Sequence, residues 1–278
     1  DAILTMDKFS NSLPVAIASI GSSKITLLVG SAITVGADAT IPDNIILWFV
    51  GPGKLFVNSG KVLTINGPSQ VLAHTQQQVF DGTGTVSFTN GGIVSPGWWG
   101  FSSGGTAAAN ADAYNACTAS LTATGGAIVI PPTGAAHQVD DTLTHPAKPM
   151  SVIGAHPELS IIESTATASL KHGLTFTRSH HVRNLTIKTS ASLASNYDMY
   201  GVRMDLDGVT VSGGNQAVKW ESVKVRGFNN SFYCDGGDAY NVDRLYFNDL
   251  DAQCSGPAST YIGSCLYINR VTQVYGTH

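Results

Sequence analysis

Acidic residues in the last quarter of the chain are the first candidates for chemistry. Asp235 and Asp238 flank two glycines, Asp249 and Asp251 follow soon after, and Glu221 precedes a strand-like segment. Two carboxyl groups about 5 to 9.5 Å apart can hydrolyse a glycosidic bond. If these segments stack, we expect a catalytic pair among the five acids. An Asp-Gly-Gly-Asp sequence is also an ordinary turn, and that alternative stays open.

A second group of candidates is cationic and aromatic. The segments Leu185–Ile187, Val223–Val225 and Leu245–Phe247 alternate apolar and polar residues at coil-like spacing. If they stack in register, the flanking side chains face outward and form one patch. Arginine forks bind carboxylates and a tyrosine ring offers a sugar a flat face, so the patch suits an acidic sugar polymer. The alternative interpretation is an outer face whose charged residues only contact solvent. The expected substrate-binding residues are Lys188, Lys224, Arg226, Arg244 and Tyr246.

Other catalytic motifs do not occur in the sequence. There is no nucleophile elbow, phosphate loop, zinc-protease or dinucleotide-binding motif, so the corresponding enzyme classes find no support. His180 and His181 form a pair that could act as a general base, although such pairs more often cap a turn. No cysteine has zinc-site spacing, so we expect neither a metal site nor another cofactor. One disulfide remains open among Cys234, Cys254 and Cys265.

The composition favours short β-strands and an extracellular protein. Of 278 residues only 12% are charged, 43% are hydrophobic, and 30 are glycines, which suits parallel strands with frequent turns. The formal net charge of −4 argues against a nucleic-acid partner. No apolar run is long enough to span a bilayer, so no membrane partner is expected.

The elements that would position these residues are strands on either side of one helix. Apolar residues between Ala113 and Leu121 recur at helical spacing, with Asn110 as the expected N-cap and Gly125 as the C-cap. Leu13–Pro14 is expected to break any earlier helix. Turn residues separate seven expected short strands, which are Ile25–Val29, Ala32–Val35, Ile45–Val50, Lys54–Val57, Val62–Ile65, Gln77–Phe80 and Thr85–Phe88.

Four segments between Trp98 and Ile162 occur in a characteristic order, namely Trp98–Gly100, the helix, Gly125–Pro131 and Val152–Gly154. This order resembles the opening of the pectate-lyase-like, right-handed parallel β-helix proteins. That group includes phage tailspike depolymerases and secreted polysaccharide-degrading enzymes. One departure is Gly104-Gly105-Thr106, where members often carry an acidic turn.

The resemblance implies an all-β fold, namely a right-handed parallel β-helix with one short capping α-helix. We expect a small β-helical or β-roll section over residues 1–97 and the main β-helix over residues 98–278, continued by a later domain. The resemblance further implies a homotrimer, outside the cell or on a virion, that degrades a bacterial polysaccharide. Hydrolysis would use the acids, and elimination would use a base such as Lys224 or Arg244. The alternative is a non-catalytic glycan-binding or structural fibre protein.

Overall fold

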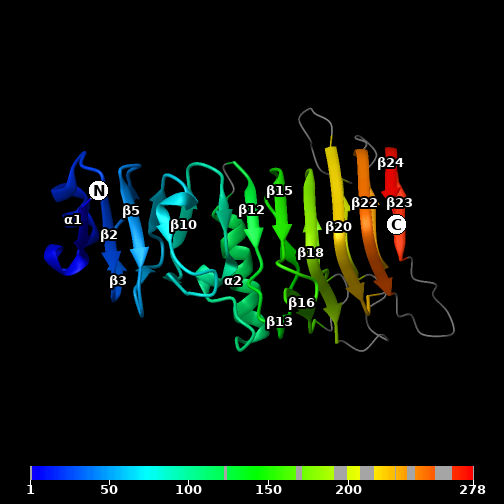
Figure 1. The fold of residues 1–278 in the computed structure, drawn as a ribbon, viewed down its shortest axis with the longest axis horizontal. Coiled ribbons are helices and arrows are strands. Elements are labelled where there is room, and N and C mark those ends of the chain that lie inside the picture. The colour runs from blue at the N-terminus through cyan, green and yellow to red at the C-terminus, as the bar shows by residue number, and fades with distance from the viewer. Residues whose placement is uncertain are drawn as a thin grey trace.

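Parallel β-strands are the main regular structure of this chain. The computed structural model describes residues 2–121, 124–166, 171–190, 199–206, 216–228, 230–236, 242–253 and 265–277. Those residues contain two α-helices, three short 3-10 helices and many strands, and every strand pair is parallel. Figure 1 shows the strands side by side along the long axis, with the two ends of the chain at opposite ends of the molecule.

Three parallel sheets form the N-terminal part. One contains β1 (Ala2–Thr5), β2 (Ile25–Val29), β5 (Ile45–Phe49) and β8 (Val71–Leu72). The second contains β3 (Ala32–Val35), β6 (Lys54–Val57) and β9 (Phe80–Gly82). The third contains β4 (Ala39–Ile41), β7 (Val62–Ile65) and β10 (Thr85–Phe88). From β2 onward, the chain visits the three sheets in a fixed order.

Two further parallel sheets form the C-terminal part. The larger contains β11 (Ile93–Val94), β12 (Gly126–Val129), β13 (Ala136–Val139), β15 (Met150–Ile153), β16 (Ile161–Ser164), β18 (His180–Thr189), β20 (Gln216–Arg226), β22 (Val242–Gln253) and β24 (Val271–Thr277). The smaller contains β14 (Leu143–Thr144), β17 (Leu174–Phe176), β19 (Tyr200–Asp205), β21 (Asn230–Asp235) and β23 (Leu266–Asn269). We call them the large sheet and the small sheet.

The long strands β18, β20 and β22 bend in the middle. The first half of β18 pairs with β15 and its second half with β16, so the bend divides the large sheet into two halves. At the bend Asn184, Ser222 and Asp249 adopt φ values of 56°, 48° and 50°. Left-handed backbone is uncommon outside glycine and most accessible to Asn and Asp. The residues on either side of these three are paired in register, so Asn184, Ser222 and Asp249 lie next to one another on neighbouring strands.

The expected register of β22 is wrong because of this bend. Leu185 pairs with Val223 as expected, but Leu245 pairs with Val218, and Leu250 is the partner of Val223. Apolar residues face the core on both sides of the bend, so alternation alone cannot tell the first half of a strand from the second. The sequence-based prediction therefore paired the second half of β20 with the first half of β22.

Helix α2 (Ala107–Ala119) starts earlier than expected. Its N-cap is Thr106, whose Oγ1 accepts a bond from the Ala109 amide at 3.3 Å. Asn110 instead lies buried inside the helix and bonds the backbone of Ser102 and Gln138, which fixes the helix to β13. The helix packs between β10 and the 3-10 helix at Pro96–Trp99 on one side and β13 and β14 on the other (Figure 1). It therefore does not lie at an open end.

An unexpected second helix, α1 (Leu13–Ile20), lies at the N-terminal end of the strands (Figure 1). Pro14 does not break it, because the amides of the first helical turn need no helical acceptor. Leu13, Ala16 and Ile20 are buried and cover the apolar core. That core continues from Met6 to Leu245 across residue 97, and the two-section division stays a prediction.

Most of the expected N-terminal strands are present. Five have the predicted bounds, and the strand from Ile45 ends one residue early, at Phe49. The prediction of Gln77–Phe80 is wrong, because β9 begins at Phe80 and runs through Gly82. Gly82 looked like a turn residue, yet it pairs with Val57 so closely that an added Cβ would lie 2.2 Å from the Val57 carbonyl oxygen.

Candidate functional site

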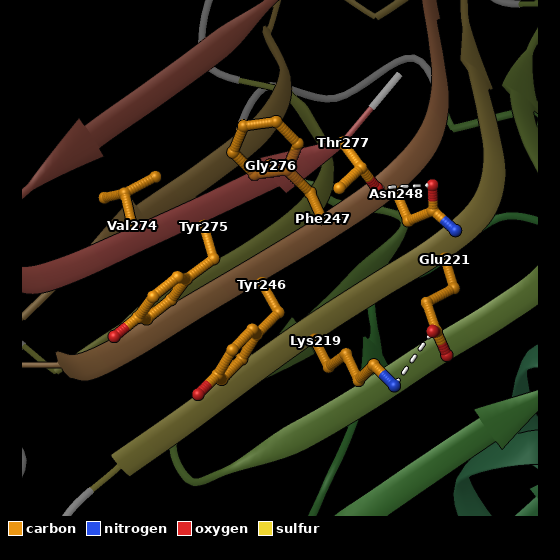
Figure 2. A pocket seen from close by; sticks show the side chains of 9 residues that line it. All are labelled: Lys219, Glu221, Tyr246, Phe247, Asn248, Val274, Tyr275, Gly276 and Thr277. Carbon is orange, nitrogen blue, oxygen red and sulfur yellow. Dashed lines mark hydrogen bonds and ion pairs between the residues drawn. The ribbon is translucent and has the colours of Figure 1, made fainter.

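A groove of about 520 Å³ crosses the outward face of β20, β22 and β24 in the first half of the large sheet (Figure 2). The polar side chains and the two tyrosines here alternate with buried residues such as Val218, Trp220 and Leu245, so they face away from the core, whereas Phe247 packs against it. We call it the tyrosine groove. It is lined by Lys219, Glu221, Tyr246, Phe247, Asn248, Val274, Tyr275, Gly276 and Thr277.

Strand register brings the polar lining into two rows. Lys219, Tyr246 and Tyr275 are partners across three strands, and so are Glu221, Asn248 and Thr277. Neighbouring members are about 4.8 Å apart, the spacing of strands in a sheet. The Thr277 hydroxyl donates to the Asn248 side-chain oxygen at 2.8 Å, which links the second row.

Two stacked tyrosines form one wall of the groove. The ring centroids of Tyr246 and Tyr275 are 4.9 Å apart with planes 9° from parallel, and Figure 2 shows the rings side by side on neighbouring strands. The Tyr275 hydroxyl donates to Gln273 at 3.0 Å. Next to the tyrosine pair, Gly276 is the strand partner of Phe247, and a Cβ there would lie 2.2 Å from the Phe247 ring. A larger residue at this position would therefore displace the Phe247 ring.

A charged cluster forms the opposite wall. The Glu221 carboxylate lies 2.8 Å from the Lys219 ammonium and 2.5 Å from His181 Nε2. The hydrogen bond from Lys219, more than that from His181, lowers the pKa of Glu221, so this acid is ionised at neutral pH. Burial lowers the pKa of His181 and outweighs the opposing effect of Glu221.

The groove continues toward β15. A second hollow of about 280 Å³ is lined by Ser151, His181 and Lys219 among others, and it shares Lys219 with the tyrosine groove. Together the two hollows cross β15, β18, β20, β22 and β24, a distance of about 19 Å at 4.8 Å per strand. Arg183 pairs with Glu221 in register, and Arg244 pairs with Ala217 at the groove's edge. Both arginines are exposed, so cations outnumber acids along this face.

The expected cationic patch is split between the two halves of the large sheet. Arg244 and Tyr246 lie on the half that holds the groove, whereas Lys188, Lys224 and Arg226 lie beyond the bend. These three cations are engaged in ion pairs. Lys188 pairs with Glu163 at 3.4 Å, Lys224 with Glu158 at 2.5 Å, and Arg226 with Asp251.

The expected catalytic acids occupy different places. Glu221 lines the groove, while Asp249 stands at the bend and Asp251 pairs with Arg226. Asp235 ends β21 in the small sheet, where it is buried and accepts bonds from the Tyr233 hydroxyl at 3.2 Å and the Asn269 amide at 3.1 Å. Asp238 lies outside the described residues.

The sequence-based prediction placed one groove residue in the wrong element and left others out. His181 lies in a strand rather than a turn and faces outward, while His180 faces the core. Lys219 and Tyr275 were not considered. A signal for Tyr275 does exist, because Leu245–Asn248 and Val274–Thr277 share the order apolar, tyrosine, any residue, polar side chain.

The cysteines add little chemistry. Cys117 is buried, and Cys234 and Cys265 are free thiols. Cys254 lies outside the described residues. Within the described ranges no group of three or more His, Cys, Asp or Glu residues is placed to hold a metal ion. No helix in that part of the chain is long and apolar enough to cross a membrane.

Comparison with protein families, curated proteins and solved structures finds no match to this chain.

Proposed function

We propose that this protein is a right-handed parallel β-helix, of the pectate-lyase-like kind, that binds an acidic polysaccharide along the tyrosine groove. The observation that carries the proposal is the stacked pair Tyr246–Tyr275 beside Lys219 on one outward face. The location that fits is outside the cell or on a virion tail spike.

The strand order supports the β-helix. From β2 to β10 consecutive strands join three different sheets in a repeating order, and from β18 to β24 they alternate between the large and the small sheet. Each of these strands pairs in parallel with a strand from the next repeat. The left-handed residues Asn184, Ser222 and Asp249 recur at the same place in three successive repeats. Such repetition is expected of a chain that winds coil upon coil.

The groove chemistry supports an acidic sugar polymer as the ligand. An aromatic ring gives a sugar an apolar surface with a polar rim, and the two tyrosines provide adjoining rings. Lys219, Arg183 and Arg244 provide cations for carboxylate or sulfate groups, against the single carboxylate of Glu221 in the groove lining. The length of the combined hollows suits several sugar units rather than one.

Cleavage of that polymer is a second candidate function, as the resemblance to tailspike depolymerases implies. Hydrolysis needs two carboxyl groups, and among the described groove residues only Glu221 supplies one. Elimination fits the charged cluster better, because neutral His181 could accept the proton at C5 of a uronic acid. The C4–O bond would then break, a C4–C5 double bond would form, and the sugar would leave as an alcohol after protonation.

The proposed homotrimer finds support in an apolar row on the N-terminal part. Leu28, Trp48 and Leu72 are neighbours in register on the outward face of β2, β5 and β8. Trp48 and Leu72 are 38% and 46% exposed. Exposed apolar faces of this kind mark contacts with other chains.

Binding to a panel of acidic and neutral polysaccharides tests the proposed function. We expect binding to acidic members only, and the double variant Tyr246→Ala/Tyr275→Ala should lose at least about tenfold in affinity. The matched control is Lys224→Ala/Arg226→Ala, which removes two cations beyond the bend and should bind like the parent. A loss in the control variant, with the tyrosine variant binding like the parent, would show that binding follows overall charge rather than the groove. Mass spectrometry of the products separates elimination, which leaves an unsaturated sugar, from binding alone.

A further inference from the structure

His181 connects to the tyrosine groove through Glu221. The Glu221 carboxylate has two oxygens, and each faces a different nitrogen group: Oε1 faces Lys219 at 2.8 Å, and Oε2 faces His181 Nε2 at 2.5 Å. All three side chains lie at the surface and are partly exposed, so protons and ligands can reach them. Lys219 is also the direct partner of Tyr246, which places the cluster against the tyrosine pair.

The hydrogen bond fixes where His181 takes up a proton. Glu221 is an acceptor only, so neutral His181 must carry its hydrogen on Nε2 and keep Nδ1 unprotonated. Protonation therefore occurs on Nδ1 and leaves the bond to Glu221 in place. The cluster then changes from neutral, with one cation against one carboxylate, to a net charge of one positive unit.

The groups that face His181 come from three strands. Lys219 and Glu221 lie on β20, Arg183 follows on its own strand, and Ser151 is its uncharged partner on β15. Burial and the nearby cations lower the pKa of His181 from its usual value, so its charge changes below neutral pH. The other histidine of the pair, His180, points into the core and does not line the tyrosine groove.

We propose that His181, acting through Glu221, sets the charge of the tyrosine groove, so that the groove holds an anionic glycan more tightly in mildly acidic than in neutral solution. The inference rests on the proposed function. His181 is a positioning residue in this scheme: its protonation neutralises Glu221, which leaves Lys219 available to the ligand.

The test measures binding of dextran sulfate at pH 7.5 and pH 5.5, with uncharged dextran as the control ligand. Sulfate groups stay ionised over this range, so a change in affinity reports the protein. We expect about fivefold tighter binding at pH 5.5, the equivalent of one partly exposed ion pair. His181→Gln keeps an amide donor for Glu221 but cannot titrate, and should lose this pH dependence. His74→Gln removes an exposed histidine on the N-terminal part and should keep it.

The outcomes separate the two proposals. If the parent protein binds dextran sulfate equally at both pH values, or if His181→Gln keeps the parent's pH dependence, the role of His181 is refuted while the groove remains. If the parent binds no acidic polysaccharide at either pH, the proposed function itself fails. Circular dichroism at both pH values establishes that each variant is folded when its affinity is measured.

Discussion

Mild acid should destabilise this protein through three buried histidines. Burial lowers the pKa of His145 and of His172 to about 4 and that of His180 to about 3. In the unfolded chain all three titrate near 6.5. Below about pH 6.5 the unfolded state therefore binds protons that the folded state does not, and stability falls as the pH drops toward the folded values. Between pH 7.5 and 5.0 each histidine should cost about 2 kcal/mol, so the three together cost about 6 kcal/mol.

The contacts of His180 explain why it stays neutral. Trp220 Nε1 donates to His180 Nε2 at 2.9 Å, and His180 Nδ1 lies 3.2 Å from the Arg178 carbonyl oxygen. The neutral ring thus donates from Nδ1 and accepts at Nε2, so a second proton would point at the indole N–H. The ring also stacks on Phe176 with centroids 3.9 Å apart, which excludes water from its face.

His145 is held in a similar way on the other face of Phe176. The ring centroids of His145 and Phe176 are 3.9 Å apart, and His145 bonds the Tyr114 hydroxyl and the Thr175 carbonyl oxygen, both at 2.8 Å. Its nitrogens are therefore both satisfied in the neutral form. A charge on either histidine would lie in an apolar stack, and no carboxylate among the described residues is bonded to it.

Urea denaturation at pH 7.5 and pH 5.0 measures the effect. His180→Gln should lose about a third of the pH dependence, because its amide oxygen can accept the Trp220 bond but does not titrate. His156→Gln is the control, since His156 is exposed. A free energy of unfolding that is the same at both pH values would refute the reasoning. So would a His180→Gln variant with the full pH dependence of the parent.

Two further predictions concern packing and assembly. Leu121 is fully buried just after α2, so Leu121→Ala should lower the free energy of unfolding by about 2–5 kcal/mol. The control Leu159→Ala, at a site that is 46% exposed, should change it little. Equal thermal melts for the parent and Leu121→Ala would contradict this. The apolar row should hold a trimer together, so Trp48→Ser/Leu72→Ser should lower the mass seen by light scattering; a parent that is monomeric at every concentration would rule the trimer out.

Most N-terminal strands could be predicted from the sequence because turn residues lie between them. Gly51, Gly60 and similar residues with positive φ end short apolar segments, and five N-terminal strands have the predicted bounds. Helix α1 was missed because Pro14 was read as a breaker, although a first-turn position suits proline. Turn residues therefore predict turns well, but a proline breaks a helix in its interior and is accepted in its first turn.

The candidate site was only partly predictable. Glu221, Arg244 and Tyr246 were identified by type and lie on one outward face. Their neighbours in the groove were not identified, because the left-handed bend restarts the alternation of inward and outward side chains within each long strand. The position of this bend becomes visible only when whole strands are paired. Ion pairs such as Lys224–Glu158 join residues far apart in the chain, so the sequence offered no reason to separate these cations from the groove.

Hydroxyl-radical footprinting with an acidic polysaccharide tests the tyrosine groove most directly. Tyr246 and Tyr275 should be protected from oxidation by the bound polymer, while exposed Trp48 on the N-terminal part and exposed Tyr267 on the small sheet should react as they do without it. Neutral dextran should protect none of the four. Protection of Trp48 or Tyr267, with Tyr246 and Tyr275 still fully reactive, would contradict binding in the groove.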